Sequence, residues 1–384
     1  MTTPWEKAAI AGIGQTEFSQ KSGRSELRLA SEAILAALDD AGLTADGVDG
    51  LCTFDLDSND PATVAVTLGL PAVTHFWASG YGGGGGCATI MSAAMAVITG
   101  AADVVVAYRA MNERSGRRYG QARAGSAVPP RAAFATPYGI HTAAQGFALN
   151  AARYMHDFGV TNADLAPVAV ANRRHAANNP AARFYGRPIT TADHQASRWI
   201  VEPVLRLLDC CLESDGAVAI VVTSTERARD LAHPPVPITA AAQGLTTPVM
   251  RNYYVPDITE AAETGVAARK LWAAAGLTPA DVQTAVLYDH FTPLVLTQLE
   301  ALGFCPRGEA KDFVADGAIE IGGRLPVNTH GGLMGEAYIH GMNGIAEAVR
   351  QIRGTAINQV AGVEHVLVTS GPGVPTSALI VGRA

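Results

Sequence analysis

Short apolar runs alternate with amphipathic segments along the first part of the chain. Residues 8–13 form an apolar run with the length and composition of a buried strand. Residues 26–41 then carry apolar side chains at helical spacing, between Ser25, a good N-cap, and Gly42, which suits the position after a helix end. A second helix is predicted over 88–99 and a strand over 104–107. Apolar strands that alternate with helices predict an α/β fold with a largely parallel sheet.

The chain repeats part of this pattern. The tetrapeptide Ala-Gly-Leu-Thr at 41–44 recurs at 275–278, and a valine follows each copy four residues later. In both places a helix is predicted to end at the glycine and an apolar strand to follow, over 50–54 and 284–288. A glycine-rich turn that leads into a helix and a strand also occurs twice, at 82–107 and 331–369. Two elements in the same order predict a duplicated α/β half.

Two breaks in the pattern divide the chain. From about 112 to 198 the sequence is rich in Arg, Asn, Pro and Gly, although 143–158 keeps helical spacing. A long insertion of this kind serves a site or an interface more often than a core. Residues 232–257 hold five prolines, which predict a link. We therefore expect an N-terminal half over 1–235, including a loop insertion at about 112–198, and a C-terminal half over 236–384.

Composition and charge narrow the class of protein. Hydrophobic residues make up 48% and charged residues 16%, against a usual charged share of about 25%, which is typical of a compact enzyme with much buried surface. The net charge of −7 gives no reason to expect nucleic-acid binding. The N-terminus lacks a signal-peptide pattern, and we find no apolar run of ~18 residues. The expectation is a cytoplasmic protein without a membrane span.

The five cysteines are odd in number and show no CxxC spacing. A disulfide framework and a four-cysteine zinc site are therefore both disfavoured. Two of the cysteines, Cys210 and Cys211, are adjacent in an apolar context that is typical of core residues.

Four segments together resemble the thiolase superfamily, and most closely its lipid-transfer-protein branch, which includes aldolases of bacterial steroid side-chain degradation. They are the glycine run 82–86 before Cys87 with the helix end at 100–103, the segments 209–211 and 214–217, Tyr288-Asp289-His290-Phe291, and Asn328-Thr329-His330-Gly331-Gly332 through Gly341 and Gly344. The resemblance covers nearly the whole chain.

This resemblance has several implications. It implies the thiolase-like five-layer αβαβα fold built from two duplicated halves, and a tight homodimer. It also implies a partner protein with an OB-fold and a zinc ribbon, which would give a 2+2 heterotetramer. Zinc would then belong to the partner, and no cofactor or metal is expected in this chain, since the acyl-CoA thioester is the substrate.

The chain departs from the thiolase pattern where thiolases do their chemistry. The position of the nucleophilic cysteine falls on Gly83, and Cys87 lies four residues later, about one helical turn on. The histidine of the Gly-His-Pro motif falls on Tyr338, and the asparagine or histidine of the preceding motif falls on Tyr288. The acid/base cysteine falls near Thr369. Because both thiolase cysteines are missing, Claisen chemistry through an acyl-enzyme is expected to be lost.

The remaining residues suit the retro-aldol cleavage of a β-hydroxyacyl-CoA, and the resemblance implies that its acyl group is a 17-hydroxy steroid side chain that ends in a CoA thioester. We predict that Tyr288 and Tyr338 form the acid/base pair, and the sequence leaves open which of them takes the hydroxyl proton. A tyrosine with its ordinary pKa of about 10 is a poor base unless its neighbours change that value. Backbone N–H groups at glycine turns can hold an oxyanion. The predicted oxyanion-binding and substrate-binding residues are Gly83, Gly371, Gly373, His290 and His330.

Four alternative hypotheses of function or mechanism stay open. A Schiff-base aldolase would need a buried lysine, and the four lysines lie in polar surroundings. A metal aldolase would need clustered ligands, and no HxH or HxxxH spacing occurs. A thiolase with relocated catalytic groups would need a reactive Cys87. A non-catalytic acyl-CoA or sterol carrier would keep the fold without the cysteines.

Five arginines gather in the predicted insertion over 114–131, and the one acidic residue near them is Glu113, just before this range. Arginine forks suit phosphate oxygens, so these side chains could hold the CoA phosphates or dock a partner. A solvated loop fits equally well. The same two readings apply to a second group, Arg173, Arg174, Arg183 and Arg187.

Overall fold

The structure is a computed structural model of the whole chain, and it describes residues 3–80, 82–116, 118, 135–246, 257–371 and 376–384. Nine strands form one mixed sheet in the order β3-β2-β4-β7-β1-β8-β11-β10-β9. The strands are β1 (Ala8–Gln15), β2 (Gly50–Phe54), β3 (His75–Ser79), β4 (Val104–Asn112), β7 (Asp215–Ser224), β8 (Val236–Gly244), β9 (Thr284–Val286), β10 (His365–Ser370) and β11 (Thr376–Gly382).

The strand order repeats, as expected of duplicated halves. In the first half the strands in chain order are β1, β2, β3, β4 and β7, and the sheet runs 3-2-4-5-1 in those ranks. The second half runs β9-β10-β11-β8, which is the same arrangement without its third strand. The predicted domain boundary at 235–236 stays a prediction.

The prediction of a largely parallel sheet is wrong. Only the β2–β3, β2–β4 and β9–β10 pairs are parallel, and the other five pairs are antiparallel. Four of these five pairs involve β7 or β11, which are inserted between strands that the helical crossovers would otherwise place side by side, and the fifth pair, β1–β8, joins the two halves. Apolar runs show that a strand is buried on both faces, but not the direction of its neighbours.

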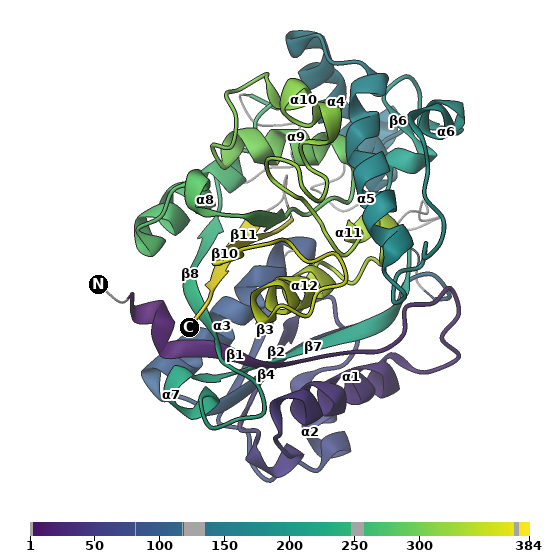
Figure 1. Cartoon of the computed structure of the whole chain (residues 1–384). Coiled ribbons are helices and arrows are strands. Elements are labelled where there is room, and N and C mark those ends of the chain that lie inside the picture. The colour runs from purple at the N-terminus through teal and green to yellow at the C-terminus, as the bar shows by residue number, and fades with distance from the viewer. Residues whose placement is uncertain (1–2, 81, 117, 119–134, 247–256, 372–375) are drawn as a thin grey trace.

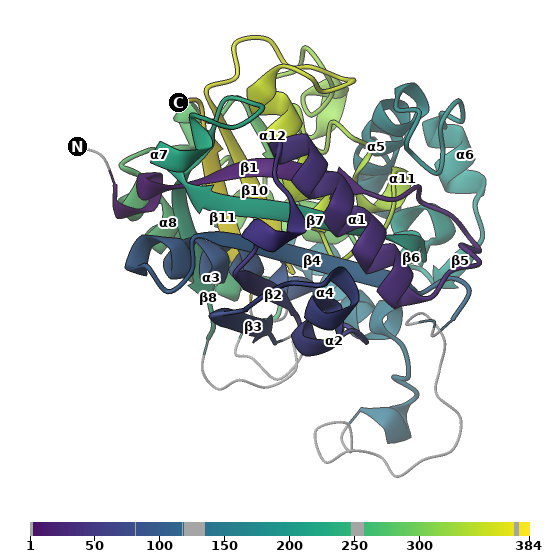
Figure 2. The same cartoon turned by 90° about the horizontal axis from the view of Figure 1, so that it is seen from below.

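Three layers of helices alternate with the two halves of the sheet: one layer on the outer face of each half, and one between the halves. Figure 2 shows α1 (Glu26–Ala41) lying across the strands of the first half, where it contacts β1, β7 and β4, and α2 (Pro61–Leu68) packs beside it. The two helices that follow glycine turns, α3 (Gly86–Thr99) and α12 (Met342–Arg353), contact strands of both halves (Figure 1). On the far side α8 (Ala262–Ala275) packs on β8 and β11.

Three hydrophobic clusters match these layers. One lies between α1 and the first half-sheet, one is central and includes residues of α3, α12 and both half-sheets, and one lies between the second half-sheet, α8 and α9 (Thr292–Ala301). The thiolase-like five-layer α/β architecture is therefore confirmed. The window 82–99 is long and apolar enough to cross a membrane by length and composition, but 61% of it is buried and it includes the central helix α3.

The insertion is more helical than expected. Residues 143–158 form α4 (Ala143–Phe158) as predicted, and α5 (Ala166–Asn178) and α6 (Thr191–Ala196) were not predicted. The small β5 (Trp199–Val201) and β6 (Leu205–Arg206) follow. The remaining helices are α7 (Thr225–Ala228), α10 (Ala310–Phe313) and α11 (Gly332–Gly335).

Candidate active site

Two tyrosines meet at the junction of the two halves. The hydroxyl groups of Tyr288 and Tyr338 are 2.9 Å apart, and Tyr288 donates to Tyr338. Tyr288 follows β9 and is buried, whereas Tyr338 lies in the turn between α11 and α12 and is half-buried. The rings meet edge to face, with centroids 6.2 Å apart. The structure thus joins two residues that are 50 positions apart in the sequence.

Gly83 lies directly against this pair. A Cβ atom at position 83 would be 2.0 Å from the Tyr288 hydroxyl oxygen, which is far shorter than any real contact. Only glycine therefore leaves room for this hydroxyl. The space beside the backbone of Gly83, where the sequence pattern predicts the thiolase nucleophile, is taken up by a phenol that comes from the other half of the chain.

The second glycine turn packs on the first. Gly371 has a φ of +65°, and a Cβ atom there would be 2.3 Å from the backbone nitrogen of Gly84. Gly341, with a φ of +83°, lies against the ring of Tyr288. The predicted oxyanion-binding glycines Gly83 and Gly371 are therefore brought together at the tyrosine pair. Gly373 lies outside the described residues.

Burial keeps both tyrosine hydroxyls protonated. It raises the pKa of Tyr288 well above its ordinary value, and the hydrogen bond with Tyr338 only partly offsets this. Burial also raises the pKa of Tyr338, as does the neighbouring Tyr288. The nearby carboxylate of Glu113 acts in the same direction on both pKa values. At neutral pH the site therefore holds two neutral hydroxyl groups and no tyrosinate.

A closed ring of hydrogen bonds fixes the backbone of Tyr288. Its N–H donates to Thr369 Oγ1 at 3.0 Å, and its carbonyl accepts from Gln298 Nε2 at 2.9 Å. Thr369 Oγ1 in turn donates to Gln298 Oε1 at 2.6 Å. The residue near the place of the second thiolase cysteine thus positions a catalytic candidate through its backbone.

The two residues after Tyr288 have separate tasks. Asp289 is buried and accepts from the backbone N–H groups of Leu333 and Met334 at the start of α11, and from Asn172 Nδ2 at 2.7 Å. Burial raises the pKa of Asp289 to about 7. This carboxyl group anchors the turn that follows Gly332, and its hydrogen bonds go to that turn and to α5.

His290 lies beside the tyrosine pair. Its ring packs edge-on against Tyr288, with centroids 5.0 Å apart, and against Phe147 of α4 at 4.5 Å. Burial lowers the pKa of His290 to about 3, so the imidazole is neutral at physiological pH. The structure therefore places this predicted site residue next to Tyr288.

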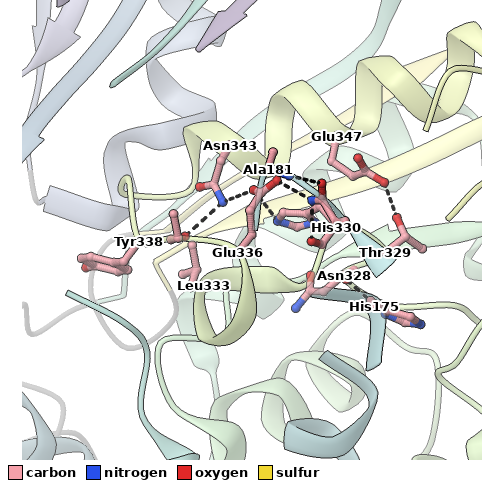
Figure 3. Close-up of polar contacts among 12 residues, drawn as sticks. His175, Ala181, Asn328, Thr329, His330, Leu333, Glu336, Tyr338, Asn343 and Glu347 are labelled. Carbon is pink, nitrogen blue, oxygen red and sulfur yellow. Dashed lines mark hydrogen bonds and ion pairs between the residues drawn. The ribbon is translucent and has the colours of Figure 1, made fainter. Parts of the chain in front are cut away.

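His330 lies elsewhere, in a buried polar network behind the turn (Figure 3). Its Nε2 atom is 3.9 Å from Glu336 Oε2, and Glu336 accepts hydrogen bonds from Asn179 and Asn343. Figure 3 shows the ring of Tyr338 on the far side of this network from His330. Burial lowers the pKa of His330 to about 3 and raises that of Glu336 to about 7. The network supports the turn that carries Tyr338.

A buried charge pair that was not predicted lies at the same turn. Arg109 of β4 donates from Nε to His340 Nδ1 at 3.0 Å and forms an ion pair with Asp57 at 2.8 Å. The signal was present in the sequence, because Arg109 is the one charged residue in the apolar run 104–111. A buried arginine in a strand requires a partner.

A thiolase with relocated catalytic groups would need a reactive Cys87, and a Schiff-base aldolase would need a buried lysine, but neither side chain has the required environment. Cys87 is fully buried, its N–H donates to Ser370 Oγ at 3.0 Å, and burial raises the pKa of its thiol to about 12, so it is not an activated nucleophile. Three of the four lysines are exposed, and Lys311 pairs with Asp312, so no lysine meets the needs of a Schiff base. In the described ranges His, Cys, Asp and Glu side chains form no group of three or more that could hold a metal ion.

The described arginines of the insertion are in part structural. Arg118 pairs with Glu213, and Arg174 pairs with Glu320. Arg173 is buried, with its guanidinium carbon 3.5 Å from the centroid of the Phe184 ring, so the solvated reading is wrong for it. Arginines 117, 123 and 131 lie outside the described residues.

Comparison with known proteins now identifies the class. Residues 8–203 match the family "Thiolase, N-terminal domain", and residues 247–381 match "Thiolase C-terminal domain-like". The chain belongs to the thiolase family. The human mitochondrial 3-ketoacyl-CoA thiolase shares the fold, with a TM-score of 0.71 at 14% identity over 99% of this chain and all of that one.

The most similar relatives form a narrower group. A 17-hydroxy-3-oxo-4-pregnene-20-carboxyl-CoA lyase of Mycobacterium tuberculosis is 62% identical over 98% of this chain and 99% of its own length. A steroid side-chain-cleaving aldolase of Thermomonospora curvata is 60% identical over 98% and 97%. A solved structure described as "Ltp2-ChsH2(DUF35) aldolase" superposes with a TM-score of 0.95 and 58% identity, covering 100% of this chain and 99% of that one. The resemblance to the aldolase branch is confirmed.

Proposed function

We propose that this protein is a carbon–carbon lyase that cleaves a 17-hydroxy-3-oxo-4-pregnene-20-carboxyl-CoA thioester into a 17-keto steroid and propionyl-CoA. One relative, 62% identical over nearly the whole chain, is named a 17-hydroxy-3-oxo-4-pregnene-20-carboxyl-CoA lyase, and another, 60% identical, is named a steroid side-chain-cleaving aldolase. The observation in the site that carries the proposal is the hydroxyl pair of Tyr288 and Tyr338, which fills the place of the missing thiolase cysteine at Gly83.

The reaction is a retro-aldol cleavage. A base takes the proton of the C17 hydroxyl group, the C17–C20 bond breaks, and its electron pair passes to C20 as the enolate of the thioester. C17 becomes the ketone, and protonation of C20 gives propionyl-CoA. The reaction therefore moves one proton from oxygen to carbon and consumes none.

A pair of hydrogen-bonded neutral hydroxyls suits this balance. One tyrosine accepts the substrate proton as it passes its own to the other, and the second delivers a proton to C20. The 2.9 Å contact between Tyr288 and Tyr338 provides this path, and the raised pKa values of both groups favour a concerted transfer over a free tyrosinate. The glycine turns at Gly83 and Gly371 would supply backbone donors to the thioester oxygen.

The direct test is mass spectrometry of the products formed from this steroid thioester. The protein is used together with its co-purified partner. The expected result is a 17-keto steroid and propionyl-CoA in equal amounts. Intact substrate in spite of measured binding would overturn the lyase and favour the carrier.

We also propose a partner of the DUF35 class, because the description of the solved relative, "Ltp2-ChsH2(DUF35) aldolase", joins it to such a protein. A zinc ion would belong to that partner, and this chain would need no cofactor of its own. The proposed location is the cytoplasm.

A homodimer completes the proposed assembly. Strand β3 lies at the edge of the nine-stranded sheet, and two of its side chains, Phe76 and Trp77, are 70% and 52% exposed. An uncovered edge strand with exposed aromatic side chains is a ready surface for pairing with a second copy. We propose that β3 pairs with β3 of a second copy.

A further inference from the structure

The residues around His340 hold its backbone and its imidazole ring in a defined position. This residue lies between Tyr338 and the helix α12, and its backbone has a φ of +49°, which is rare for a residue with a side chain. Its ring stacks on Phe54, with centroids 5.7 Å apart, and meets the ring of Tyr338 edge to face at 5.2 Å. Backbone strain of this kind persists where the surroundings hold a residue firmly, and it is frequent at functional sites.

The contact with Arg109 determines the tautomer of His340. An arginine keeps its charge throughout the range in which proteins fold, and its Nε–H can only donate. The 3.0 Å contact between this group and His340 Nδ1 therefore requires a lone pair on Nδ1. A neutral imidazole with a lone pair on Nδ1 carries its proton on Nε2.

Asp57 holds the arginine in this role. Its carboxylate accepts from Arg109 Nη1 at 2.8 Å and from the backbone N–H of Ala110 at 2.9 Å. The side chains of Arg109 and Asp57 are 3% and 0% exposed, so solvent screens neither of them. The guanidinium group is further held by the carbonyl oxygen of Ala110 at 2.7 Å.

We propose that Arg109 and Asp57 lock His340 as the uncharged tautomer with its proton on Nε2, so that the active site keeps a fixed neutral N–H donor, and no cation, beside Tyr338. A protonated imidazole at this place would stabilise a tyrosinate, and the proton shuttle needs both tyrosines to carry their protons. Arg109 is thus a positioning residue, and this role rests on the proposed function.

The other charged and titratable groups around His340 agree with this state. Among the described residues these groups include Arg109 from β4, Asp57 after β2, Tyr338 from the same turn and His290 after β9. Burial lowers the pKa of His340 well below its ordinary value, and the positive charge of Arg109 acts in the same direction.

The first test is nuclear magnetic resonance of the complex with ¹⁵N-labelled histidine, with a His340→Gln variant to assign the signals. The proposal predicts that His340 has an unprotonated Nδ1 and a protonated Nε2 at every pH from 5 to 8. A protonated Nδ1, or uptake of a second proton in this range, would overturn the proposal. This readout does not depend on turnover, so it can fail while the lyase activity stands.

The second test compares pH profiles of kcat/KM. Arg109→Gln removes both the donor and the positive charge that lowers the pKa of His340, so His340 should titrate at a higher pH than in the wild type, at a value that burial still keeps below the usual pKa of about 6.5. Below that pH, kcat/KM should fall about tenfold per pH unit, a limb that the wild type lacks and that Arg109→Gln/His340→Gln should lose again. If Arg109→Gln lowers kcat/KM equally at every pH, Arg109 is only structural. If wild type shows no turnover at all, the proposed function fails instead.

Discussion

At the scale of single residues, the site lacks a side chain at one position and has a larger side chain from another position in the same space. The comparison with the thiolase pattern puts the nucleophilic cysteine of thiolases at Gly83, in the glycine turn just before α3. The room that the missing side chain leaves is filled by the Tyr288 hydroxyl, which is 2.0 Å from where a Cβ atom would be. The loss of the nucleophile and the gain of the phenol are therefore one coupled change.

This coupling predicts the effect of one methyl group. Gly83→Ala should lower kcat about 100-fold or more, because the methyl group displaces the Tyr288 hydroxyl from Tyr338 and general acid–base catalysis contributes roughly 10²–10⁴. Steady-state kinetics measures the effect. The matched control is Gly265→Ala in α8, where the nearest atom to a new Cβ is Arg269 Nη1 at 3.7 Å. An active Gly83→Ala variant would contradict the coupling.

Some of these residues could be predicted from the sequence and others could not. The sequence predicts Tyr288 and Tyr338 at one site because motifs on either side of them fix their places, and the structure brings their hydroxyl groups together. His330 was placed at the site by the same motifs, yet its ring faces the interior network, since the sequence does not record side-chain direction. The contact between Arg109 and His340 joins residues 231 positions apart, and only folding reveals it.

At the scale of elements, a buried polar cluster connects the insertion to the segment after β9 that carries Tyr288. Asp209 accepts from Thr292 Oγ1 at the start of α9 and from Asn162 Nδ2, and contacts His194 Nε2 of α6 at 2.8 Å. The next residues continue the connection, since Cys211 N–H donates to the carbonyl of His290. Helices of the insertion thereby help to set the position of the segment that carries Tyr288.

The turn between α11 and α12 predicts a pH dependence of stability. In the folded chain Glu336 has a pKa of about 7, because burial penalises its charged form. An unfolded glutamate titrates near 4.3, so the folded state holds an extra proton between these values. The free energy of unfolding should therefore fall as pH rises from about 4 to about 7.

Glu336→Gln should remove this contribution, which amounts to at most about 1.4 kcal/mol per pH unit for one proton. Denaturant unfolding at several pH values between 5 and 8 measures the slope. Glu226→Gln, at an exposed position in α7, is the control. Equal slopes for Glu336→Gln and wild type would show that Glu336 does not hold the extra proton.

Elements were predictable where signals are local. Ser25 caps α1 and Gly42 ends it, both as expected from the sequence. The direction of the strands was not predictable, because it depends on β7 and β11 pairing with strands from distant parts of the chain. The extra helices of the insertion were missed because α5 is rich in Asn, Arg and Ala and has little apolar periodicity.

At the scale of the whole molecule, the exposed edge of the sheet predicts the assembly. Phe76→Glu/Trp77→Glu on β3 should convert the proposed dimer to a monomer, because a charge on each face of the edge strand prevents pairing. Light scattering should give twice the subunit mass of 39.8 kDa for the wild type and one such mass for the variant. Ile357→Glu, exposed after α12, is the control. A dimer that survives the two charges would place the interface elsewhere.

The central claim is that the two tyrosine hydroxyls carry the proton of a retro-aldol cleavage. The most direct test is the rate of propionyl-CoA release by Tyr288→Phe and Tyr338→Phe, with Tyr185→Phe, at an exposed position, as control. Each of the first two variants should lose about 100-fold or more in kcat while still binding propionyl-CoA, because only a hydroxyl group is removed. Turnover at the wild-type rate in both variants would contradict the account.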